Sequence, residues 1–114
     1  MKRTLLAMLM TAGLATPALA QGAIGTVERG TFVCELPGNA AGQAGIAQPS
    51  RGFTIESAAR YSSPQGSGTY LRRGDTLTFT SGPRQGESYQ LLSERFARLI
   101  ENGQPGRLRC VRQG

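Results

Sequence analysis

The stretch of residues 68–83 constrains the fold of this chain most, because it contains two short strand patterns joined by a tight turn. Residues 76–80 alternate threonine with Leu77 and Phe79. Since a strand points successive side chains to opposite faces, this pattern gives one apolar face and one hydroxylated face. Gly74 supplies the positive φ that a short hairpin loop needs. We therefore expect an antiparallel hairpin at the centre of the fold.

Similar strand patterns recur on both sides of this hairpin, with glycine or proline at nearly every connection. Further strands are expected over residues 30–36, 53–57, 87–91 and 107–112. The segments 37–52 and 62–68 are rich in small and turn-forming residues and predict surface connections. Residues 93–101 fit either a strand or a short helix capped by Ser93, and the Asn102-Gly103 turn that follows favours the strand.

The N-terminus has the organisation of a secretory signal peptide. A basic Lys2-Arg3 pair precedes an apolar run over residues 5–14, and Ala18-Leu19-Ala20 provides the small residues of a cleavage site. The apolar run is too short to span a bilayer, and Gln21 stands where a lipoprotein would have cysteine. We expect a periplasmic or secreted protein, cleaved near Ala20. The expected organisation is a signal peptide, residues 1–20, and a single exported β domain, residues 21–114.

The chain has two cysteines, Cys34 and Cys110. In an exported chain they most simply form a disulfide, because their separation fits neither a C-x-x-C redox motif nor a zinc-ligand spacing. A chain-entropy model gives such a bond about 4–5 kcal/mol of stabilisation. The bond requires the two Cα atoms to lie within about 7 Å. The first and last strands of the domain should therefore be neighbours or face each other across the core.

Together these patterns predict an all-β fold: a small antiparallel meander of about six to eight short strands. The meander is expected to form either a curved sheet or a barrel, and one disulfide closes it. With 114 residues, the chain has room for one small domain.

The sequence lacks the groups that most catalytic sites need. It has no histidine, which removes the commonest general base and metal ligand. The turn position of Asp75 explains that residue without catalysis, and the loop Gly38–Gly45 lacks the lysine of a phosphate-binding loop. The glutamates, expected in turns or on outward strand positions, are Glu28, Glu35, Glu56, Glu87, Glu94 and Glu101. We expect no enzyme, no cofactor and no metal site.

Arginine is the most suggestive feature of the composition. The formal net charge is +6, and beyond Lys2 every cationic side chain is arginine. If Cys110 faces inward, Arg107 and Arg109 share the outer face with Val111. Guanidinium groups on one face bind phosphate or carboxylate bidentately; the simpler explanation is that they keep the protein soluble. The candidate anionic-ligand surface comprises Arg72, Arg73, Arg95, Arg98, Arg107, Arg109 and Arg112.

Three runs of the sequence carry a resemblance to known proteins. GTFVCELPGNAAG, FTIESAARYSSPQGSGTYLRRGDTLTFTSGPRQGESY and GRLRCVR resemble a group of small exported bacterial proteins of uncharacterised role, over nearly all of residues 21–114. The most specific parts are the G-T-Y-L…G-D…T-S-G-P core and the terminal C-V-R. Some members carry the name elongation factor P, a cytoplasmic three-barrel protein that presents a lysine or arginine to the ribosome. The residues here do not support that activity, because the chain has length for one barrel and carries an export signal. In architecture, the expected domain is also similar to periplasmic protease inhibitors.

These observations predict a non-catalytic exported binding or envelope-associated domain. Its best candidate surface joins the arginine-bearing hairpins to the 37–52 loop. The expected partner is an anionic envelope component or another exported protein, with no nucleic acid and no membrane span. The alternative is a small exported inhibitor that plugs a protease or lytic enzyme with a loop or terminus. An enzyme using paired glutamates is the third hypothesis.

Overall fold

The structure is a computed structural model that describes residues 23–38 and 45–113. The expected signal peptide, residues 1–20, lies outside the described residues. Within them, no helix is long and apolar enough to cross a membrane. The elements are β1 (Ile24–Gly25), β2 (Gly30–Pro37), β3 (Gly45–Ala47), the 3-10 helix η1 (Pro49–Arg51), β4 (Phe53–Ile55), β5 (Arg60–Ser63), β6 (Gly66–Arg73), β7 (Thr76–Phe79), β8 (Ser88–Ser93), β9 (Phe96–Glu101) and β10 (Gln104–Arg112).

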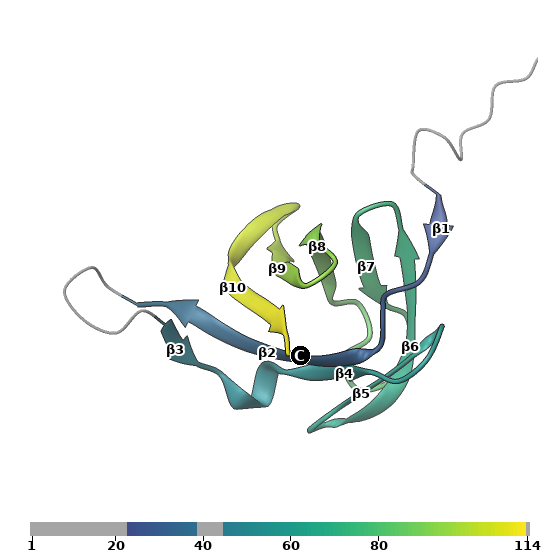
Figure 1. Ribbon diagram of the computed structural model, residues 1–114, viewed down its shortest axis with the longest axis horizontal. Helices are drawn as coiled ribbons and strands as arrows, with labels where there is room; N and C mark the ends of the chain where they lie inside the picture. Colours follow the sequence, from purple (N-terminus) through teal and green to yellow (C-terminus); the bar gives the residue numbers. More distant parts are fainter. Residues whose placement is uncertain (1–22, 39–44, 114) are drawn as a thin grey trace, which may run out of the picture.

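Eight of these strands form a closed antiparallel barrel (Figure 1). From β4 to β10 each barrel strand pairs with the next along the chain, β2 pairs with β4, and β10 returns to pair with β2. The two remaining strands lie outside the barrel: β1 pairs with β6, and β3 pairs with residues 35–37 at the C-terminal end of β2. The predicted antiparallel meander is confirmed, and the sheet closes into a barrel.

The disulfide lies on the β2–β10 seam, where the barrel closes. Cys34 and Cys110 are bonded, are direct register partners across the two strands, and have Cα atoms 4.0 Å apart. The predicted bond is therefore confirmed. Of the two expected arrangements, the strands are neighbours in the sheet rather than partners across the core.

One face of each strand supplies the core. On β7, Leu77 and Phe79 are fully buried, while the threonines between and before them are only half-buried. Aromatic rings fill much of the barrel: Tyr61 stacks on Phe79 with ring centroids 4.0 Å apart. The interior is thus occupied by side chains, as expected for a barrel of this strand number. The other core members are Val27, Phe32, Cys34, Phe53, Ile55, Tyr70, Tyr89, Leu91, Ala97, Leu99, Leu108 and Cys110.

The predicted connection over residues 62–68 is wrong. β5 continues to Ser63 and β6 begins at Gly66, so only a two-residue turn separates them. Gly68 is the register partner of Tyr61, and a Cβ at Gly68 would lie 2.8 Å from the Tyr61 ring. A glycine inside a strand often marks such a close approach. Small residues here make room for an aromatic ring within paired strands.

Other boundaries shift by a few residues. The predicted 37–52 loop contains β3 and η1, and its residues 39–44 lie outside the described residues. The strand expected over 53–57 ends at Ile55, and the one expected over 87–91 spans residues 88–93.

The ambiguous segment 93–101 is a strand, as the turn after it indicated. β9 ends at Glu101, and Asn102 and Gly103 have positive φ angles of 55° and 79°. Two successive residues with positive φ match the turn that best suits the twist of a two-residue hairpin. The β9–β10 hairpin therefore brings Arg98 of β9 and Arg107 and Arg109 of β10 onto one sheet face.

Candidate anion-binding groove

The structure divides the seven predicted arginines into separate groups. Arg98, Arg107 and Arg109 lie together on the outer face of β9 and β10. Arg72, Arg95 and Arg112 lie at one end of the barrel, around the turn between β8 and β9. Arg73 lies at the end of β6, four strands from β10 in either direction around the barrel. The predicted surface is therefore not one patch.

Strand alternation and register explain why the first group forms. On β10, Leu108 and Cys110 are buried, which turns Arg107 and Arg109 outward with Val111, as the sequence predicted. Arg98 on β9 is the register partner of Arg109, so both project from the same face.

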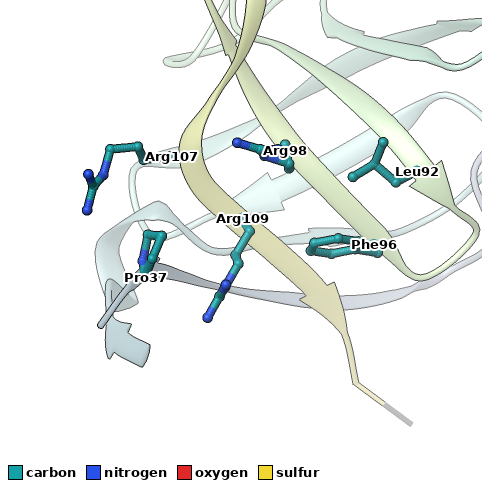
Figure 2. Close-up of a pocket in the computed structure, with 6 residues that line it drawn as sticks. All are labelled: Pro37, Leu92, Phe96, Arg98, Arg107 and Arg109. Atoms are coloured by element: carbon teal, nitrogen blue, oxygen red, sulfur yellow. The ribbon is translucent and has the colours of Figure 1, made fainter. Parts of the chain in front are cut away.

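These three arginines line a groove of about 230 Å³ (Figure 2). We call it the arginine groove; it is lined by Pro37, Leu92, Phe96, Arg98, Arg107 and Arg109. Figure 2 shows Leu92 and Phe96 at one side of the groove and Arg107 and Pro37 at the other. Among the described residues of the predicted 37–52 loop, Pro37 alone belongs to the lining.

Contacts within the groove leave it cationic. Nε of Arg98 donates to the carbonyl oxygen of Gly106 at 3.0 Å, a neutral partner. Nε of Arg109 donates to the carboxylate of Glu35 at 2.8 Å, which offsets one charge. The exposed Arg107 side chain makes no hydrogen bond or ion pair with any residue that the structure describes. The described lining residues include no carboxylate, although Glu35 is bonded to Arg109 and Glu101 lies against Gly106 nearby.

The arginines at the barrel end are engaged in holding loops together. Arg72 donates two hydrogen bonds to Glu94, each at 3.1 Å, and a third to the carbonyl of Thr26. The bonds from Arg72 hold the pKa of Glu94 below its ordinary value. Arg112 is mostly buried and pairs with Glu28 at 3.1 Å. Arg72 and Arg112 thus already have anionic partners within the chain, and Arg95 donates to the carbonyl of Arg112.

Sequence reasoning missed Arg84, the most buried arginine in the described residues, at 6 % exposed. It lies in the loop between β7 and β8. Its Nη1 and Nη2 donate to the carbonyls of Gly52 and Arg51 at 2.8 and 2.7 Å, and Nη2 also donates to the Tyr89 hydroxyl at 2.9 Å. Nε pairs with Glu87 at 3.1 Å. Nothing in the sequence distinguishes this arginine from its exposed neighbours, because the two carbonyls that it binds, those of Gly52 and Arg51, are 32 and 33 residues away along the chain.

The same buried network shifts the ionisation of a tyrosine. The pKa of Tyr89 is raised to about 12, chiefly because the hydroxyl is buried; the charge of Arg84 opposes this rise and the charge of Glu87 adds to it. The Tyr89 hydroxyl donates to Glu87 at 3.0 Å. Arg84 also lies over the ring of Phe79, with its Cζ 5.5 Å from the centroid. Arg84 therefore closes this end of the barrel, and its hydrogen-bonding groups face protein atoms.

No family model, curated protein or solved structure matches this chain. In the described ranges, no group of three or more aspartate, glutamate or cysteine side chains is placed to hold a metal ion. The chemistry of the arginine groove is therefore the basis for a functional proposal.

Proposed function

We propose that this protein is a non-catalytic exported module that binds phosphate or carboxylate groups in the arginine groove. The observation that carries the proposal is the gathering of Arg98, Arg107 and Arg109 around one groove whose described lining residues include no carboxylate. A guanidinium presents a planar fork of donors that matches both anions. Because Arg107 makes no ion pair with the described residues, its charge is available to a ligand.

The size of the groove limits what it can hold. Pockets for drug-sized ligands span roughly 300–1,000 Å³, whereas this groove has about 230 Å³. It suits one anionic group carried by a larger partner. The disulfide and the N-terminal pattern support export, so the partner would be a phosphate- or carboxylate-bearing component of the cell envelope.

The test compares two variants that lose the same formal charge. The groove variant is Arg98→Gln/Arg107→Gln/Arg109→Gln. The control variant is Arg29→Gln/Arg60→Gln/Arg73→Gln. These three side chains form no ion pair in the described residues. Each oxidised protein is applied to a resin bearing phosphate groups and eluted with rising salt.

The groove variant should elute at clearly lower salt than the control variant, because clustered guanidiniums bind an anion together and are screened by salt. Equal shifts would mean that net charge alone explains the retention, and the proposal would fail. Salt-insensitive capture of a single hydrolase from envelope extract, unaffected by the groove variant, would instead indicate the inhibitor hypothesis.

A further inference from the structure

An exposed apolar row runs beside the arginine groove on the same sheet face. Val111 is the register partner of both Phe96 and Val33, so these side chains lie side by side across β9, β10 and β2. Leu92 lines the groove together with Phe96. Leu92, Val33 and Val111 are 48 %, 45 % and 37 % exposed. We call Leu92, Phe96, Val111 and Val33 the outer apolar row.

Two arginines lie next to this row, each two residues along its strand from a member of the row. Arg109 is two residues from Val111 on β10, and Arg98 is two residues from Phe96 on β9, so each pair shares the outer face. The next row on this face holds Arg98, Arg109 and Glu35, the carboxylate that pairs with Arg109. With Arg107 beside it, this part of the face has three arginines against one glutamate and is net cationic. Arginine beside exposed apolar side chains is the composition of protein surfaces that lie in a membrane interface.

We propose that this face docks onto an anionic lipid surface, with a headgroup phosphate in the arginine groove and the outer apolar row against the acyl-chain boundary. This inference rests on the proposed function and names the carrier of the anion. Charge complementarity favours an anionic surface over a second copy of the chain, because the face has three arginines against one glutamate and two copies face to face would repel. The groove volume of about 230 Å³ matches a headgroup-sized anion.

The chain contains no tryptophan, so a single introduced tryptophan reports its own surroundings. The reporter is Leu92→Trp in the outer apolar row. The matched control is Leu71→Trp, which replaces the same residue type at 37 % exposure on β6, opposite β10 in the barrel. Each protein is mixed with vesicles of phosphatidylglycerol and phosphatidylcholine, or of phosphatidylcholine alone.

With the anionic vesicles, Leu92→Trp should show a blue-shifted emission that brominated acyl chains quench, while Leu71→Trp should show neither. Adding the three groove substitutions should lower the vesicle partition coefficient by about 100-fold, because each arginine adds attraction near an anionic surface. Substituting Arg29, Arg60 and Arg73 instead should lower it much less. If Leu92→Trp fails to fold, as judged by its melting curve, Val33→Trp is the second reporter.

A second experiment, with a soluble ligand in place of vesicles, separates this inference from the proposed function. Glycerol 3-phosphate carries the headgroup phosphate without acyl chains, and its binding is followed by NMR at the arginine Nε–Hε signals. Groove signals that shift with glycerol 3-phosphate, without vesicle binding, would overturn the lipid inference and leave the proposed function standing. Vesicle binding that is equal for both tryptophan reporters would also overturn it. The absence of both responses would overturn both proposals, and tight binding to an acidic protein but not to vesicles would replace the lipid partner.

Discussion

Two regions of this barrel use arginine in opposite ways. At the closed end, Arg84 is 6 % exposed and donates to backbone carbonyls, a carboxylate and a tyrosine hydroxyl. On the outer face, Arg107 is exposed and has no partner among the described residues. A buried guanidinium with all of these contacts is part of the fold, whereas an exposed one is available to bind. Surroundings, and not spacing along the chain, decide between the two uses.

The largest effect is expected from the seam that supports the groove. Cys34→Ser/Cys110→Ser should lower the free energy of unfolding by about 4–5 kcal/mol, because the open chain regains the entropy of a long loop. Denaturant unfolding under oxidising conditions measures the change, and reduced wild-type protein should match the variant. An unchanged unfolding midpoint would show that the bond does not stabilise this barrel.

The second test compares the two regions directly. Arg84→Gln should lower the free energy of unfolding by about 3 kcal/mol. The substitution removes the buried cation that pairs with Glu87, and it leaves the carbonyls of Gly52 and Arg51 without their donors. Arg107→Gln should change it by no more than about 0.5 kcal/mol. Arg84→Lys is the control that keeps the charge but loses the fork of donors. Equal costs for Arg84→Gln and Arg107→Gln would remove the distinction between the regions.

The third effect appears only in alkali and is absent at neutral pH. Because the pKa of Tyr89 is raised to about 12 in the folded state, its contribution to stability is complete below pH 10 and is lost as the pH rises toward 12. The free energy of unfolding should therefore fall by about 3 kcal/mol over that range. In Tyr89→Phe this part of the decline should be absent. Parallel pH profiles for the two proteins would indicate that Tyr89 ionises normally.

Local patterns were sufficient to predict most of the fold. The alternation of residues 76–80 with Gly74 before it predicts the central hairpin, and Asn102-Gly103 predicts the last one. The cysteine pair predicts that the first and last barrel strands meet. The connection over residues 62–68 was mispredicted because its serines and glycines are typical of loops. Gly68 is needed inside the strand instead, because a Cβ there would collide with the backbone carbonyl of Ser81 and with the Tyr61 ring, and these contacts are set by the tertiary structure.

The candidate site was only half predictable. Alternation on β10 places Arg107 and Arg109 outward, once Cys110 is known to face in. It does not reveal that Arg98 joins them, because the β9–β10 register shifts between Pro105 and Arg109. Nor does it separate this group from Arg72, whose partner Glu94 comes from a turn on another hairpin. Register and loop contacts are tertiary facts, so the split of the arginines required the structure.

The closure of the barrel between β2 and β10 has a consequence for how the chain folds. Nearly all other barrel pairings join strands that follow one another closely, whereas this seam joins residues 76 positions apart. Distant pairings must first overcome the entropy of closing a long loop. We therefore expect an open sheet to assemble first and to wrap shut last. Until it does, the unpaired edges of β2 and β10 are exposed to other chains. An unfolded chain that keeps its disulfide already holds these two strands together, so refolding avoids the slow step of bringing them into contact.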